Sequence, residues 1–129
     1  MTTTISGSSG IVFPDLTTMQ TGQQAVKAWV NFNGTGTVAI RAGYNVASIT
    51  DNGAGSYTVN FTTAMVDANY SSLGTAAWAP VAYLDSGEVV WEYTKTTTSL
   101  GVLVGVPGSY GATAAAYYDN PAVNITIFR

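Results

Sequence analysis

In the stretch Ala25-Val26-Lys27-Ala28-Trp29-Val30-Asn31-Phe32-Asn33, small or apolar side chains alternate with polar ones and a tryptophan. Because successive side chains of a β-strand point to opposite faces, this alternation predicts a half-buried strand. The predicted core face carries Val26, Ala28, Val30 and Phe32. The opposite face carries Lys27, Trp29 and Asn31.

The same period of two recurs along the chain. Ser56–Thr62 places Tyr57, Val59 and Phe61 on one face, and the last stretch places Val123, Ile125 and Ile127 on one face. Further short apolar runs lie at residues 37–41, 46–50, 70–84, 89–94 and 100–104. Turn signals rich in Gly, Asn and Asp separate them, as at residues 33–36, 51–55 and 85–87. This spacing predicts an all-β protein, an antiparallel β-sandwich or a barrel-like domain.

The N-terminal segment has a different composition. Its first ten residues are rich in Thr, Ser and Gly, and they lack the basic and apolar regions of a signal peptide. We therefore divide the chain into an extended N-terminal arm, residues 1–24, and a β-sandwich domain, residues 25–129. The arm contains a short apolar run closed by a turn signal, which we take as a candidate anchor: Ile11, Val12, Phe13 and Pro14.

The charge content is low. Charged residues make up 9% of the 129 residues, against about 25% in an ordinary soluble domain. This composition favours a subunit that buries much of its surface in an obligate oligomer. The four cations, Lys27, Arg41, Lys95 and Arg129, are scattered, which argues against nucleic-acid binding and against attraction to an anionic membrane. No apolar run approaches the ~20 residues of a membrane span, so we expect no membrane insertion.

Residues suited to catalysis or metal binding are few. The chain has no Cys and no His, which removes disulfides, thiolate metal sites and the commonest general base. Asp85, Glu88 and Glu92 are close in sequence, but Glu88 and Glu92 on one strand face would be roughly 13 Å apart, too far for a glycosidase pair. Residues 51–56 fit a turn better than a calcium loop. We expect no enzyme activity, no cofactor and no bound metal.

Aromatic residues are concentrated in the second half of the chain. They are Trp78, Tyr83, Trp91, Tyr93, Tyr110, Tyr117 and Tyr118. Such side chains pack in cores and subunit interfaces, or they stack on sugar rings and protein surfaces. Because loops on a rigid scaffold often carry binding residues, the Gly/Ala-rich stretch 105–120 is the candidate binding loop. Its candidate receptor- or partner-binding residues are Tyr110, Tyr117, Tyr118 and Asp119.

One segment resembles a known type of module. Lys27-Ala28-Trp29-Val30-Asn31-Phe32-Asn33-Gly34-Thr35-Gly36-Thr37-Val38-Ala39-Ile40-Arg41 is similar to a segment of tail-fibre and other virion proteins of tailed bacteriophages. The likeness continues through residues 44–53 and 57–62 and covers about half of the chain. Residues 11–15 resemble a Phe-Pro-Asp segment that often precedes such modules. Leu16 and Val66 depart from the pattern, at turns where Gly and Pro are usual.

The resemblance implies a β-structured, often trimeric, module on a phage particle. The predicted function is that of a virion structural protein, a homotrimeric tail-fibre or tail-tip component that takes part in host attachment by binding. Its expected partners are further copies of itself, other virion proteins through the arm, and a host surface glycan or protein.

Two alternatives to this function stay open at this stage. Because the chain has no rod region, it also suits a capsid decoration protein that stabilises the phage head, so its expected location is the tail or capsid surface of the virion. A glycan depolymerase would be a third class. The lack of His and of a paired carboxylate site argues against an enzyme.

Overall fold

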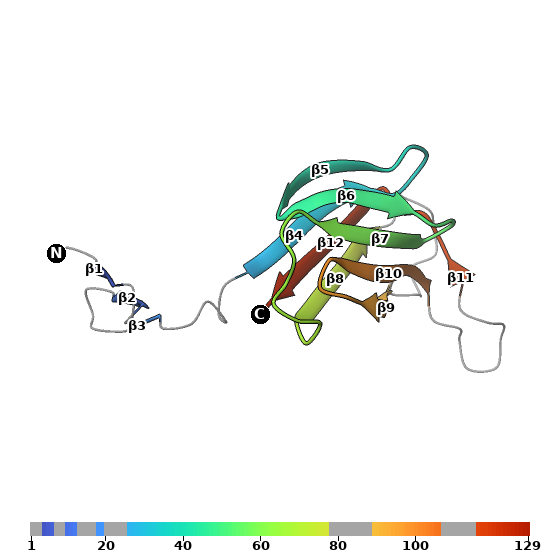
Figure 1. Ribbon diagram of the computed structural model, residues 1–129. Coiled ribbons are helices and arrows are strands. Elements are labelled where there is room, and N and C mark those ends of the chain that lie inside the picture. Colours follow the sequence, from blue (N-terminus) through green and yellow to red (C-terminus); the bar gives the residue numbers. More distant parts are fainter. Residues whose placement is uncertain (1–3, 7–9, 13–17, 20–25, 78–88, 107–115) are drawn as a thin grey trace.

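The protein is all-β, and its main body is two antiparallel sheets packed face to face (Figure 1). This confirms the predicted sandwich. The computed structural model describes residues 4–6, 10–12, 18–19, 26–77, 89–106 and 116–129.

The first sheet has four strands in the order β5-β4-β12-β8. They are β4 (Val26–Asn33), β5 (Ala39–Tyr44), β8 (Ser71–Ala77) and β12 (Ala122–Phe128). The central pair joins β4 to β12, with Val30 opposite Ile125, although the two strands lie far apart in the sequence. The sheet is therefore complete only when β12, the last strand, pairs with β4.

The second sheet is organised around β10 (Ser99–Val106). Along one side of β10 runs β9 (Val89–Lys95); along the other run β7 (Ser56–Phe61) and the short β11 (Ala116–Tyr117). The edge strand β6 (Val46–Asp51) pairs with β7.

The N-terminal segment contributes a small sheet of its own. Strands β1 (Thr4–Ser6), β2 (Gly10–Val12) and β3 (Thr18–Met19) pair in that order. Of the candidate anchor, Ile11 and Val12 lie in β2, whereas Phe13 and Pro14 lie outside the described residues. The division at residue 24 and the anchoring role stay predictions.

The core lies between the facing sides of the two sheets. The four central strands each contribute three fully buried or nearly buried side chains, and those of β4, β7 and β12 lie on the faces that the alternation predicts. They are Ala28, Val30 and Phe32 of β4, Val123, Ile125 and Ile127 of β12, Tyr57, Val59 and Phe61 of β7, and Leu100, Val102 and Val104 of β10. Burying one large side chain of this kind contributes on the order of 1.5–3 kcal/mol, so this core is the main source of stability.

Val26 is a correction to the predicted face of β4. The register passes from Ile127 opposite Ala28 to Phe128 opposite Val26, so Lys27 is the extra residue of a β-bulge. A bulge interrupts the strict alternation of faces. Val26 is therefore 39% exposed rather than buried beside Ala28.

Tyr57 connects both sheets at one end of the sandwich. Its ring is fully buried and meets Phe32 edge-to-face, with 5.1 Å between the ring centroids. Its hydroxyl donates to the Asp119 carboxylate at 2.8 Å, and the Gly34 carbonyl lies 3.1 Å away as a second acceptor. A Cβ on Gly34 would collide with the tyrosine hydroxyl, so the turn after β4 needs glycine here.

We predict that Tyr57→Phe lowers the free energy of unfolding by about 1.5–3 kcal/mol, because it removes a buried donor from a carboxylate. Urea denaturation followed by circular dichroism measures the change. Tyr117→Phe is the matched control: Tyr117 is 41% exposed, and we expect a change within about 0.5 kcal/mol. Equal stability of Tyr57→Phe and the unmodified protein would contradict the role given to this hydroxyl.

Candidate functional site

The outer side of the four-stranded sheet carries a row of large side chains. Pairing across the strands places Tyr44, Trp29, Thr126 and Leu73 side by side, one from each of β5, β4, β12 and β8. Tyr44 is 59%, Trp29 40% and Leu73 63% exposed. The neighbouring pair Val26 and Phe128 is also exposed. We call these five residues, Val26, Trp29, Tyr44, Leu73 and Phe128, the apolar face.

A polar row runs beside the apolar face. Ala42, Asn31, Asn124 and Thr75 pair across the same four strands. The Asn31 side-chain amide donates to the side-chain oxygen Oδ1 of Asn124 at 2.6 Å, and the Asn124 side-chain amide donates to the Thr75 hydroxyl at 3.4 Å. These amides bond to one another, so this row is polar without carrying charge.

Such a surface is suited to contact with another macromolecule. Contiguous exposed apolar patches on soluble proteins often mark interaction sites, and interface centres are rich in aromatic residues and poor in charge. The five residues of the apolar face include three aromatic side chains and no charge.

A pocket of about 460 Å³ lies next to the apolar face. Its wall contains two of the four cations of the chain, Lys27 and Arg129, together with the exposed ring of Tyr44. The other lining residues are Asn45, Thr62, Thr63, Ala64, Met65 and Val66. The pocket and Tyr57 lie at opposite ends of the sandwich. Tyr57 is at the start of β7, whereas the pocket is built from the start of β4 and from the residues after β7.

Asn45 holds this end of the molecule together. It has φ 55°, a left-handed conformation that Asn tolerates, and it stands where the chain leaves β5 of one sheet for β6 of the other. Its side-chain amide donates to the backbone carbonyl of Lys27 at 3.0 Å and to that of Thr63 at 3.1 Å, and its side-chain oxygen Oδ1 accepts the Thr63 N–H at 2.7 Å. Asn45 therefore fixes the pocket wall rather than offering free groups to a ligand.

The two cations of the pocket have different surroundings. Arg129 forms an ion pair with Asp67. The hydrogen bond from Arg129, and to a smaller extent the one from the Asn69 N–H, hold the pKa of the Asp67 carboxyl below its usual range. The Nε–H of Arg129 is buried and has no hydrogen-bond partner among the described residues. The Lys27 side chain forms no hydrogen bond or ion pair within the described part of the chain. The pocket thus retains cationic groups with unused hydrogen-bonding capacity.

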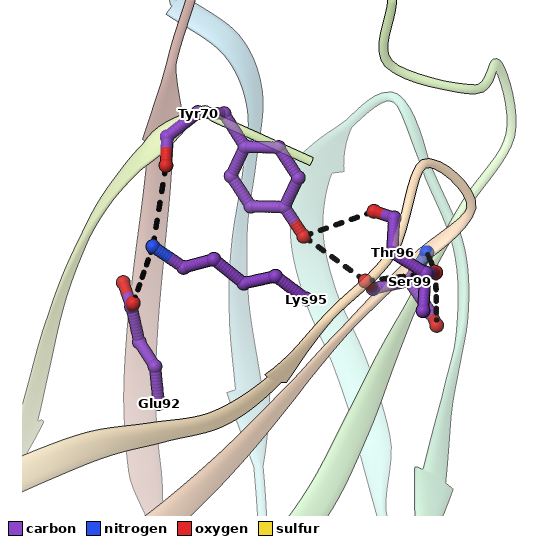
Figure 2. A network of polar contacts seen from close by, with 5 residues as sticks. All are labelled: Tyr70, Glu92, Lys95, Thr96 and Ser99. Carbon is purple, nitrogen blue, oxygen red and sulfur yellow. Dashed lines mark hydrogen bonds and ion pairs between the residues drawn. The ribbon is translucent and has the colours of Figure 1, made fainter. Parts of the chain in front are cut away.

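A separate polar network has a structural explanation. Figure 2 shows Tyr70, whose hydroxyl lies 3.2 Å from the Thr96 carbonyl and 3.0 Å from the Ser99 carbonyl, at the turn between β9 and β10. Lys95 donates to the Tyr70 carbonyl at 3.2 Å and pairs with Glu92. Burial, and then the negative charge of Glu92, raise the pKa of Tyr70 to about 12. The raised pKa of Tyr70 is therefore explained by its packing against the turn between β9 and β10.

The structure places three of the four predicted binding residues near each other. Tyr117 is in β11 and meets Trp91 edge-to-face at 6.0 Å, and Tyr118 follows it with 39% exposure. The Asp119 carboxylate binds the Gly55 N–H and the Tyr57 hydroxyl, both at 2.8 Å, so it already has an internal role. Tyr110 lies outside the described residues. A receptor-binding role for this group stays a prediction.

Of the predicted carboxylates, Glu92 lies on β9 in its ion pair with Lys95, while Asp85 and Glu88 lie outside the described residues. Within the described ranges no three Asp, Glu, His or Cys residues are grouped in a way that could hold a metal ion. The same ranges contain no helix long and apolar enough to cross a membrane.

Comparison of the chain with family models, with curated proteins and with solved structures gives no match. The similarity to phage virion modules therefore remains a sequence-based prediction.

Sequence reasoning missed both the apolar face and the pocket. Trp29 was placed correctly on the outer side of its strand, which was the one available signal. Leu73 belongs to β8, whose partner β12 is distant in the sequence, and Tyr44 lies beyond the apolar run 37–41 that the sequence analysis identified. The pocket joins residues 27, 44–45, 62–66 and 129, and no local pattern links these positions.

We predict a loss of stability at alkaline pH that depends on Tyr70. Because its pKa is about 12 in the folded protein, against 10.0 for an unburied tyrosine, the folded state binds the phenolic proton more tightly. This contribution is fully present below pH 10.0 and is lost as the pH rises through about 12. Urea unfolding at a series of alkaline pH values measures it.

Tyr70→Phe is the informative variant for this prediction. It keeps a ring that can pack against Phe61, 5.8 Å away in the native pair, but it lacks the titrating hydroxyl. We expect lower stability at neutral pH, by about 1 kcal/mol, and a shallower decline in alkaline solution. An equally steep decline in both proteins would exclude Tyr70 as the source.

Proposed function

We propose that the chain is a structural component of a bacteriophage particle, a homotrimeric tail-fibre or tail-tip protein that takes part in host attachment by binding. The observation that carries the proposal is the apolar face across all four strands of one sheet. Subunit contact centred on Trp29, Leu73 and Phe128 would remove large apolar side chains from water. Tyr44, on the edge strand β5, lies at the border of the face and also lines the pocket.

The composition of the face supports self-association. Trp and Tyr dominate the binding energy of many protein interfaces, because a rigid ring buries a large area at a small cost in side-chain entropy. Trp29 and Tyr44 stand next to each other on paired strands, and Leu73 and Phe128 extend the apolar area toward β8 and β12. The adjacent Asn31–Asn124 row offers hydrogen bonds that can fix the register of two subunits.

Two properties of the sequence agree with this proposal. The 9% of charged residues is low for a protein that remains a monomer in water. The segment from Lys27 to Arg41, which resembles phage virion modules, forms β4, the following turn and the first part of β5. The segment that carries the resemblance therefore also carries Trp29 of the apolar face.

We predict that the purified protein has a mass of about 40 kDa by multi-angle light scattering, three times the 13.4 kDa of one chain. Leu73→Glu should shift the mass toward that of the monomer, since burying an unpaired carboxylate in an apolar contact is strongly unfavourable. Thr94→Glu is the matched control, because Thr94 is an exposed residue on β9 of the other sheet. A monomeric native protein, or a trimer that only Thr94→Glu disrupts, would contradict the proposal.

Immunogold labelling tests the location. We expect antibodies against the sandwich domain to mark the tail of phage particles whose genome encodes the chain. Labelling of the head surface would replace the tail function with capsid decoration. Unlabelled particles would contradict a virion role altogether.

A further inference from the structure

We propose that the pocket lined by Lys27, Tyr44 and Arg129 binds a carboxylate-bearing sugar unit of an acidic glycan. The inference deepens the proposed attachment function and rests on it for the source of that glycan, the host surface. The chemistry of the pocket is argued from its own residues.

The cations of the pocket supply the first argument. Lys27 and Arg129 line one cavity, although the chain has a net charge of −3 and four basic residues in all. Among the described residues, one side-chain carboxylate, that of Asp67, is paired with these two cations. Lys27 therefore has its charge and its donors available for a ligand carboxylate, and charge-assisted hydrogen bonds of this kind are the stronger ones.

The backbone around Lys27 supplies the second argument. Lys27 is the extra residue of the bulge between β4 and β12, and bulges near functional sites redirect a side chain out of the regular alternation. The backbone carbonyl of Lys27 accepts a hydrogen bond from the Asn45 side chain. The same side chain also bonds to both the N–H and the carbonyl of Thr63. The backbone of Lys27 is thus fixed relative to Thr63, another residue of the pocket lining.

The remaining lining residues suit a sugar ring. Tyr44 presents an aromatic side chain that is 59% exposed, and aromatic faces stack on the apolar C–H faces of sugars. The Thr62 and Thr63 hydroxyls make no hydrogen bond with the described residues, so they are available to sugar hydroxyl groups. The volume of about 460 Å³ lies within the range of small-ligand sites, about 300–1,000 Å³.

The test is a titration of the ¹⁵N-labelled protein with methyl β-D-glucuronide, followed by amide chemical shifts. We expect saturable shifts confined to residues near the pocket, around 44–45 and 62–66. Methyl β-D-glucoside, which lacks the carboxylate, and sodium acetate, which lacks the ring, should each bind at least about tenfold more weakly. Affinity for the glucuronide should fall with added salt, because the pairing is electrostatic.

Two variants, each of which removes one positive charge, test whether Lys27 is the cation that binds the carboxylate. Lys27→Gln should weaken glucuronide binding about tenfold, and its backbone carbonyl still accepts from Asn45. Arg41→Gln is the matched control on β5 outside the pocket lining, and it should bind like the native protein. The amide spectrum of each variant reports whether the fold is intact.

Several outcomes would overturn the inference. These are the absence of saturable shifts with the glucuronide, equal binding of glucoside or acetate, shifts located away from the pocket, or unchanged binding by Lys27→Gln. The titration uses the isolated protein and measures ligand binding in the pocket alone. Particle labelling and the solution mass instead test the proposed virion function. Failure of one can therefore be told from failure of the other.

Discussion

The hydrogen bonds of the Tyr57 hydroxyl, made at the end of a fully buried side chain, are the constraint on which the rest of the sandwich depends. The ring belongs to the core of the second sheet and packs on Phe32 of the first. Its hydroxyl binds Asp119, which leads into β12, and lies beside Gly34 in the turn after β4. Asp119 in turn accepts the Gly55 N–H in the turn before β7. A single phenol thus joins the three connections whose strands form the centre of the fold.

The opposite end of the sandwich is organised by different chemistry, and this difference matters for function. There, Asn45 bonds β4 to the residues after β7, and Arg129 pairs with Asp67. These polar groups and the bulge at Lys27 lie around the pocket, beside buried apolar residues such as Met65. The apolar face begins beside this pocket at Tyr44. Proposed subunit contact and proposed ligand binding therefore meet at one edge of one sheet, so occupancy of either surface can influence the other.

The two outer sides of the sandwich are not equivalent. On the second sheet, the β9 bulge places the Tyr93 ring over Gly101, where a Cβ would collide with it, so the protein covers part of this side with its own side chain. On the first sheet, Trp29, Leu73 and Phe128 have no comparable cover among the described residues. This contrast is why the proposed association is assigned to the first sheet.

Much of the fold was predictable because its signals are local. Alternation around Val30, Val59 and Ile125 predicted strands and their buried faces, since the side-chain period of a strand depends only on neighbouring residues. Local patterns failed at Val26, where the bulge at Lys27 depends on the register against β12. The sequence by itself determined the all-β class, the turns at 33–36 and 51–55 and most of the core; the turn predicted at 85–87 lies outside the described residues. Only the tertiary structure decided the sheet order, the apolar face and the pocket, because each depends on contacts between residues up to about a hundred positions apart, such as the pairing of Val26 with Phe128.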